Sequence, residues 1–170
     1  MTPRTWILAT AILFLFTLVR SAITHAQWSS DPTVNTPVCT ATRDQSESKT
    51  CSDGNGGIII VWRDGRSSTS GYDIYAQRLD GNGYSQWTAN GIPVCSAVGG
   101  QYDPQICTDG NGGAIIVWRD NRSPTSGWDI YAQRIDGSGT ALWTPDGVEI
   151  CTAPGAQGDF GDYFSMMSDG

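Results

Sequence analysis

Hydrophobic residues after residue 26 occur in short groups separated by polar, glycine-rich stretches. The run Ile58–Trp62 is rich in β-branched residues and apolar at successive positions, and the run Ala114–Trp118 repeats it. Such runs predict strands that are buried on both faces. The clusters SDGNGG and TDGNGG precede the two runs, and their asparagine and glycine residues tolerate the positive φ of tight turns. No apolar pattern of helical period follows residue 26, so the chain is predicted to be all-β.

The pattern recurs with a fixed period. Cys39, Cys95 and Cys151 are each 56 residues apart, and so are Cys51 and Cys107. Residues 51–94 aligned with 107–150 give 29 identities in 44 positions, whereas residues 39–50 aligned with 95–106 give only 3 in 12. One part of each unit is therefore constrained, and the other part is free to vary.

Each unit is predicted to supply four antiparallel strands. A strand around Cys51 or Cys107 leads into the apolar run, the sequence DIYAQR follows (73–78 and 129–134), and a last strand reaches Trp87 or Trp143. Four-stranded meanders that repeat every ~40 to 60 residues are typical of β-propeller blades.

The unit DGNGGxIIVWRDxR…GxDIYAQRxDGxGxxxW, followed by VC or IC, resembles a repeat of large secreted bacterial proteins. It is also similar to the blades of TolB-like propellers. The resemblance covers most of the chain and implies β-propeller-type four-stranded blades. It implies no single activity, because function does not follow from the fold.

Residues 1–26 have the features of a secretory signal peptide: Arg4, an apolar run at 6–19, and a small-x-small cleavage site that ends at Ala26. A membrane-spanning helix needs about 20 apolar residues, and the stretch between Arg4 and Arg20 is too short. We therefore expect a secreted or cell-surface protein with no membrane span after cleavage.

The remaining chain divides into 27–38, the closing strand of an incomplete blade, then repeats at 39–94 and 95–150, and a truncated repeat at 151–170. Two blades cannot close a ring that needs about four to eight. Their apolar faces are expected to be covered by further blades of the same chain or by copies of it in a homo-oligomer. We favour continuation of the chain.

Charge excludes several functions. The 170 residues contain 10 Lys+Arg and 17 Asp+Glu, a net charge of −7, so nucleic acid is not an expected partner. Loss of residues 1–26 removes Arg4, Arg20 and the only histidine, leaving 8 − 17 = −9. A chain without histidine cannot build a Ser/His/Asp triad or a His-ligated zinc site. We predict no catalytic residue, no cofactor and no metal site.

Several charged residues recur in both units, whereas a catalytic site is needed only once per ring. Recurrence therefore favours ion pairs and turn caps that define the blade. The DGNGG turns lack the downstream glutamate of a calcium loop, and turn chemistry explains them. The recurring structural residues are Asp64, Arg66, Arg78, Asp120, Arg122 and Arg134.

Two kinds of residue remain as candidates for binding or cross-linking. Tyr72 with Asp73, and Trp128 with Asp129, follow a polar loop and are candidate stacking platforms for sugars, with ordinary loop packing as the alternative. In an exported protein, Cys39 with Cys51 and Cys95 with Cys107 are candidate disulfides. The alternative is that each cysteine is a small buried side chain.

Two functions remain open. The first is a non-catalytic binding or scaffold module that presents loops to a protein or glycan ligand. The alternative is part of a carbohydrate-active propeller enzyme whose catalytic residues lie outside this chain.

Overall fold

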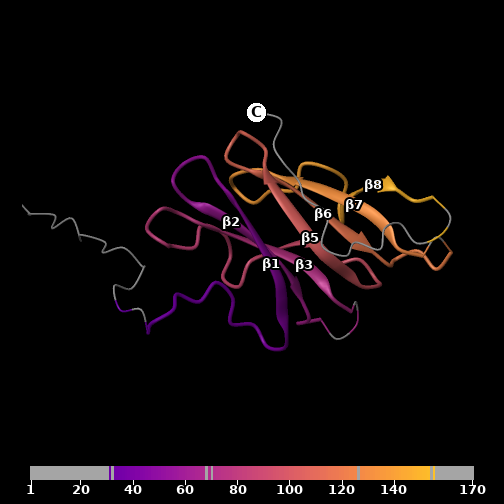
Figure 1. The fold of residues 1–170 in the computed structure, drawn as a ribbon, viewed down its shortest axis with the longest axis horizontal. Helices are drawn as coiled ribbons and strands as arrows, with labels where there is room; N and C mark the ends of the chain where they lie inside the picture. Colours follow the sequence, from indigo (N-terminus) through magenta and orange to yellow (C-terminus); the bar gives the residue numbers. More distant parts are fainter. Residues whose placement is uncertain are drawn as a thin grey trace, which may run out of the picture.

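The computed structural model describes residues 31, 33–67, 69, 71–125, 127–153 and 155; the expected signal peptide and most of 151–170 lie outside them. The described residues form no helix. They form two four-stranded antiparallel sheets, in the orders β1-β2-β3-β4 and β5-β6-β7-β8 (Figure 1). The all-β prediction is confirmed. The strands are β1 (Gln45–Ser52), β2 (Ile58–Asp64), β3 (Asp73–Leu79), β4 (Ile92–Cys95), β5 (Gln101–Thr108), β6 (Ala114–Asp120), β7 (Asp129–Ile135) and β8 (Val148–Cys151).

The DGNGG turn between β1 and β2 is fixed by Asp53. Its Oδ1 accepts hydrogen bonds from the amides of Asn55 and Gly57, at 2.8 and 2.7 Å. A Cβ at Gly57 would lie 2.3 Å from the carbonyl oxygen of Leu79, so only glycine fits there. Asp109 forms the same turn between β5 and β6.

The fourth strand of each sheet lies later in the sequence than predicted. The stretch that reaches Trp87 makes only an isolated bridge, between Ser85 and Leu79, and β4 begins at Ile92. The reason is the side chain of Gln77, whose Oε1 accepts from the amide of Trp87 at 3.0 Å and whose Nε2 donates to the carbonyl of Thr88 at 2.9 Å. The backbone is therefore satisfied by a side chain instead of a ladder, and Gln133 does the same in the second sheet.

The two sheets pack through different faces. Successive strand residues point to opposite faces, so Ile59 and Val61 lie on one face of the first sheet and Ile58 and Ile60 on the other. In the main core, Ile59, Val61, Ile74 and Ala76 of the first sheet pack against the second sheet. The face of the second sheet that they contact is the one equivalent to the Ile58 and Ile60 face of the first. On that second sheet the core residues are Ala114, Ile116, Trp118, Tyr131 and Ile135, which correspond to positions 58, 60, 62, 75 and 79 of the first.

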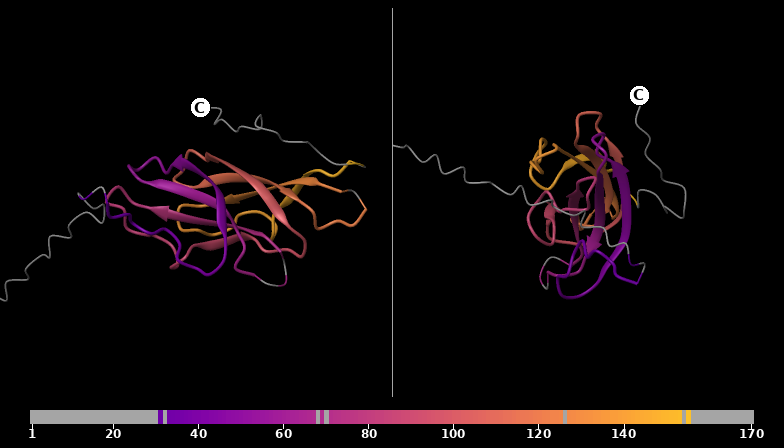
Figure 2. Two further views of the ribbon diagram at one scale, coloured as in Figure 1. Left: turned by 60° about the horizontal axis from the view of Figure 1, so that its bottom comes forward. Right: turned by 90° about the vertical axis from the view of Figure 1, so that its left-hand side faces the viewer.

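This packing is head-to-tail, because the face that the first sheet uses is not the face that the second sheet uses. The first-sheet positions Ile59 and Val61 correspond to Ile115 and Val117, which belong to a separate cluster on the second sheet. Strand β5 lies beside β1 and also contacts β2 and β3. In the left view of Figure 2 the first sheet (indigo to magenta) lies toward the left and the second sheet (orange to yellow) toward the right.

The first strand of each sheet contains a bulge. The register of β1 shifts between Ser46 and Lys49, and that of β5 shifts between Tyr102 and Gln105. Within the bulges, Glu47 and Asp103 have φ of 56° and 53°, an uncommon conformation for residues other than glycine. A bulge turns its side chain away from the regular alternation, and both residues use this to reach arginine partners.

The described part of 27–38, the predicted closing strand, contains no strand. The residues that follow nevertheless contact the first unit as the end of β4 contacts the second. The amide of Thr40 donates to Asn90 Oδ1 at 2.7 Å, and the amide of Ser96 donates to Asp146 Oδ1 at 2.9 Å. Thr40 therefore occupies, one repeat earlier, the place of Ser96.

The predicted disulfides are wrong: Cys39, Cys51, Cys95, Cys107 and Cys151 are all free. Cys39 lies against Arg66, just beyond the end of β2, whereas Cys51 is paired with Ile59 near its beginning. The five steps along the strand from Ile59 to Asp64 span about 17 Å at ~3.3 Å per residue, and a disulfide needs Cα atoms within about 7 Å. The cysteines are small buried or half-buried side chains, which was the alternative interpretation.

Candidate functional site

The recurring residues Asp64 and Arg66 form an ion pair in which the carboxylate is buried and the arginine half-buried, with Arg66 Nη2 2.6 Å from Asp64 Oδ2. The same carboxylate oxygen accepts a hydrogen bond from the indole of Trp62 at 2.7 Å. Burial raises the pKa of Asp64, but the hydrogen bonds from Arg66 and Trp62 outweigh it, so the pKa lies below its usual value. Asp120, Arg122 and Trp118 repeat the arrangement.

Arg66 also joins its sheet to the chain segment before it. Its Nη2 lies 3.3 Å from Cys39 Sγ and donates to the carbonyl of Asn90 at 2.8 Å, and its guanidinium stacks 3.8 Å from the ring centre of Tyr75. Arg122 makes the equivalent contacts with Cys95, Asp146 and Tyr131. These groups link successive units, and their positive and negative charges are already partnered.

A second recurring ion pair holds the turn of each unit. Arg78 Nη2 is 2.9 Å from Asp53 Oδ2, and Arg134 is 2.9 Å from Asp109. Burial raises the pKa of Asp53, but the amides of Asn55 and Gly57 and the Arg78 guanidinium together lower it below its usual value. Arg78 Nη1 continues to the carbonyl of Gly137 in the second unit at 2.9 Å.

The four predicted ligand residues separate into two kinds. Asp73 and Asp129 are buried, with exposed fractions of 2% and 1%, so their carboxylates are closed to a ligand from solvent. Tyr72 and Trp128 are half-buried at the surface. Of the four candidate ligand residues, the two aromatic ones are therefore accessible to a ligand, and the two aspartates are not.

Tyr72 and Trp128 are joined into one aromatic row by Tyr102 of β5, which sequence reasoning did not select. The ring centres of Tyr72 and Tyr102 are 5.5 Å apart at 65°, and those of Tyr102 and Trp128 are 5.2 Å apart at 87°. Arg63 lies 4.3 Å from the ring centre of Tyr72, and Arg119 lies 4.7 Å from that of Trp128. Edge-to-face contacts and stacked guanidinium groups make this row a rigid surface.

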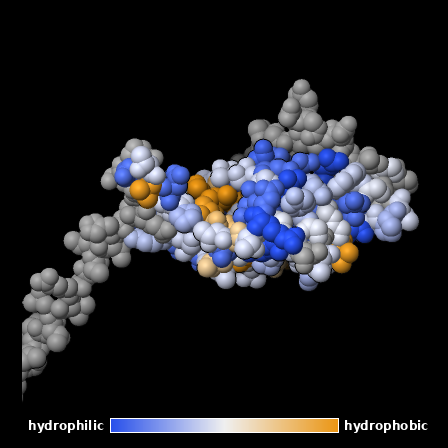
Figure 3. Space-filling model, turned by 90° about the horizontal axis from the view of Figure 1, so that it is seen from below, coloured by the Kyte–Doolittle hydropathy of each residue, from blue (hydrophilic) through white to orange (hydrophobic). Residues whose placement is uncertain are grey.

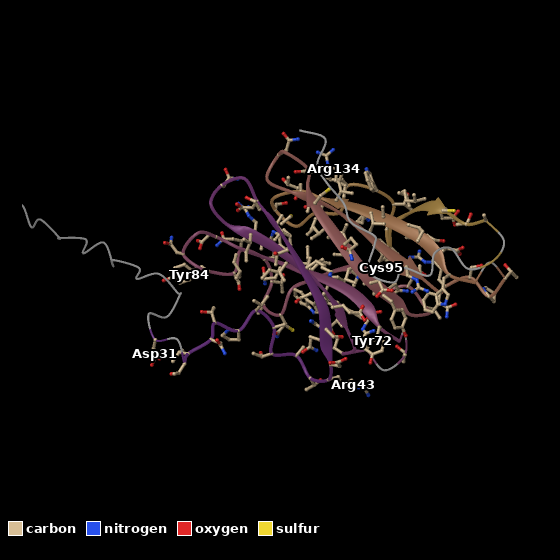
Figure 4. The ribbon with its side chains drawn as sticks, in the orientation of Figure 1. Asp31, Arg43, Tyr72, Tyr84, Cys95 and Arg134 are labelled. Carbon is tan, nitrogen blue, oxygen red and sulfur yellow. The ribbon has the colours of Figure 1, made fainter. Side chains whose placement is uncertain are left out.

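A pocket of about 350 Å³ opens at one end of this row. Its walls come from the stretch before β1, the loop after β2, and β5 of the second unit; they include Arg43, Asp44, Gly65, Tyr72 and Tyr102. Figure 4 shows Arg43 and Tyr72 at the same edge of the molecule, opposite Arg134. Arg43, Asp44 and Tyr102 all fall in the twelve-residue segments that differ between the repeats, and this variability was the signal available in the sequence.

The described residues hold no cluster of three or more side chains able to bind a metal ion. Within the same residues there is no helix of the length and hydrophobicity needed to cross a membrane. No protein-family model, curated protein or solved structure gives a significant match to the chain.

Proposed function

We propose that this chain is a β-propeller-type repeat segment that acts outside the cell as a non-catalytic binding and scaffold module. In this proposal the two sheets are successive blades. The arginines of the recurring ion pairs also contact the neighbouring unit, and so hold successive blades together. Ligand binding is assigned to loops and strand ends that differ from one unit to the next.

The observation that supports the proposal best is the head-to-tail packing of equivalent units. A contact between two different faces leaves one unused face at each end and can continue into a ring or a filament. A self-contained sandwich would instead bring like faces together.

Equivalent residues of the two units differ in exposure, depending on whether the other unit covers their face. Trp87 is 8% exposed beneath the second unit, whereas its equivalent Trp143 is 36% exposed; Val94 is 4% exposed, whereas Ile150 is 59% exposed. At the other end, Ile58 and Ile60 are half-buried although their equivalents Ala114 and Ile116 are fully buried. On the two uncovered faces, the equivalents of the buried interface residues are therefore exposed or half-buried. This is expected if a further unit packs on each of these faces.

Contacts at the start of the described chain support the same arrangement. Cys39 and Thr40 contact Arg66 and Asn90 in the same way that Cys95 and Ser96, at the end of β4, contact Arg122 and Asp146. This segment behaves as the end of a blade that precedes β1. Cys39 and Thr40 thus hold the position expected at the end of a preceding blade, although the described part of 27–38 forms no strand.

The absence of catalysis in this proposal is tested with the full chain and a panel of chromogenic 4-nitrophenyl glycosides. We expect no release of 4-nitrophenol above the buffer rate. Turnover that co-elutes with the purified chain and scales with its concentration would overturn the non-catalytic assignment and favour the carbohydrate-active alternative.

A further inference from the structure

The pocket beside Tyr72 is built from residues that the repeat does not require. One repeat later, Arg43 and Asp44 are replaced by Gly99 and Gly100, and the position of Tyr102 is held by Ser46 in the first unit. The second unit therefore lacks the two charged side chains of this pocket. Most of the lining residues differ between the two units, and only Ser67 and Gly71 are shared. A pocket lined mainly by residues that the repeat does not require is available for recognition.

We infer that this pocket binds a neutral carbohydrate, one or two sugar rings of a glycan. The inference rests on the proposed binding role and assigns its ligand class. A pocket of about 350 Å³ lies at the small end of the ~300 to 1,000 Å³ typical of ligand sites, which suits a ligand of this size.

The aromatic wall suits the less polar face of a sugar ring. Tyr72 and Tyr102, whose rings meet edge-to-face, line the pocket, and Trp128 packs against Tyr102. Aromatic faces carry partial negative charge and attract the weakly positive C–H groups of an apolar surface. Gly65 leaves room beside Tyr72, because a Cβ there would lie 3.0 Å from the Tyr72 ring.

The charges around the pocket balance, which favours a neutral ligand over an ionic one. Arg63 Nη1 lies 2.5 Å from Glu47 Oε1, and Arg63 Nη2 lies 3.8 Å from Asp44 Oδ2. The guanidinium is also stacked over the Tyr72 ring. Arg43 adds one positive charge, so two arginines face two carboxylates. An anionic ligand would gain little from a site whose charges sum to zero and whose Arg63 is already paired with Glu47 and Asp44.

Groups at the rim can bind hydroxyls. The Asp44 side chain is 59% exposed and can accept hydrogen bonds, and Arg43 is exposed, with no ion pair to the described residues, and can donate them. A neighbouring donor and acceptor suit adjacent hydroxyl groups, each of which donates and accepts. The side of the molecule seen in Figure 3, toward which Arg43 and Tyr72 lie in Figure 4, is mostly hydrophilic with small apolar patches.

The test is isothermal titration calorimetry of the full chain with neutral and anionic saccharides. The neutral probes are cellotetraose, xylotetraose, mannotetraose and maltotetraose, and the anionic probes are tetragalacturonate and sialyllactose. We expect at least one neutral probe to bind, with an affinity that changes less than about twofold when salt screens the surface charges. Binding of the anionic probes alone, or of no probe, would overturn the inference.

Substitutions locate the site. We expect Tyr102→Ala to weaken binding of the neutral probe about tenfold or more, and Arg43→Ala and Asp44→Asn each to weaken it about three- to tenfold. Lys49→Ala is the control, because Lys49 is an exposed cation on β1 outside the pocket. Arg43 and Asp44 are exposed, so their variants report on binding even if Tyr102→Ala does not fold. Unchanged affinity in Arg43→Ala and Asp44→Asn would place the sugar elsewhere and overturn the assignment.

Failure of this inference is distinguishable from failure of the proposed function. Turnover of the chromogenic glycosides contradicts the non-catalytic role, whatever the pocket binds. Absence of saccharide binding, in a chain with no turnover, contradicts only the ligand class.

Discussion

Glu47 accepts a hydrogen bond from the backbone amide of Asp103, the residue that holds its own position one repeat later, at 2.9 Å. Both residues lie in the bulge of the first strand of their sheets. Each also pairs with the arginine of its own unit, Glu47 with Arg63 and Asp103 with Arg119. The bulge thus lets one carboxylate satisfy an arginine within its unit and an amide in the next unit.

Glu47→Ala should destabilise the protein more than Asp103→Ala does. The first change removes an ion pair and leaves the Asp103 amide without its acceptor, a loss of about 1 to 3 kcal/mol. The second change keeps that amide and removes only the more exposed pair with Arg119, a loss of about 1 kcal/mol or less. Urea denaturation of both variants measures the difference. Equal losses would contradict a link between the units at Glu47.

Trp87→Ala and Trp143→Ala form a matched pair for the packing of the units. Trp87 is buried and its indole donates to the carbonyl of Gly137 at 3.2 Å, whereas Trp143 is partly exposed. We expect a loss of about 3 to 5 kcal/mol for Trp87→Ala and about 1 kcal/mol for Trp143→Ala. The free energy of unfolding is measured with urea. A larger loss at Trp143 would contradict the head-to-tail packing.

Acid should destabilise the protein through the buried aspartates. The pKa values of Asp53, Asp64 and Asp109 are lowered in the folded chain because hydrogen bonds and arginines outweigh burial. Their stabilising effect is complete above the unfolded pKa, about 3.9, and is lost as the pH falls through the lower folded values. Thermal melts should therefore change little between about pH 7 and pH 5 and fall steeply below about pH 4. A melting temperature that is unchanged at pH 3 would contradict these pairings.

The cysteines should react slowly in the folded protein. Burial raises the pKa of Cys51 and of Cys95 to about 12, and a thiol reacts as its thiolate. We expect all five thiols to be titrated with a chromogenic disulfide reagent after unfolding in urea without a reductant. In the folded chain at neutral pH, Cys51 and Cys95 should resist the reagent. Fewer than five thiols in the unfolded chain would show that a disulfide forms after all.

The strand content could be predicted from local pattern, but the position of the fourth strand could not. Apolar β-branched runs and DGNGG turns are sufficient to place β2, β3, β6 and β7, because these depend on neighbouring residues. The sequence around Trp87 also suggests a strand, yet the buried amide of Gln77 takes over its backbone hydrogen bonds. This replacement of strand pairing by a side chain depends on the contact between β3 and the segment around Trp87, which a local sequence pattern does not indicate.

The candidate site divides in the same way. Tyr72 and Trp128 stand out in sequence as aromatics beside a polar loop, but nothing local shows that Tyr102 joins them into one row or that Asp73 and Asp129 are buried. The spacing of the cysteines suggested disulfides, because spacing along a chain does not report distance in space. Cys39 and Cys51 are separated by the length of β2.

The sequence by itself determined the all-β architecture, the 56-residue period, and which positions of each unit are constrained. These follow from turn chemistry and strand alternation, which act over a few residues. Only the tertiary structure decided which face of the first sheet covers which face of the second, that the cysteines stay apart, and that Arg43, Asp44, Tyr72 and Tyr102 surround one pocket. The physical reason is that burial and contact between units depend on the relative placement of two sheets, which is set by the packing of side chains distant in sequence.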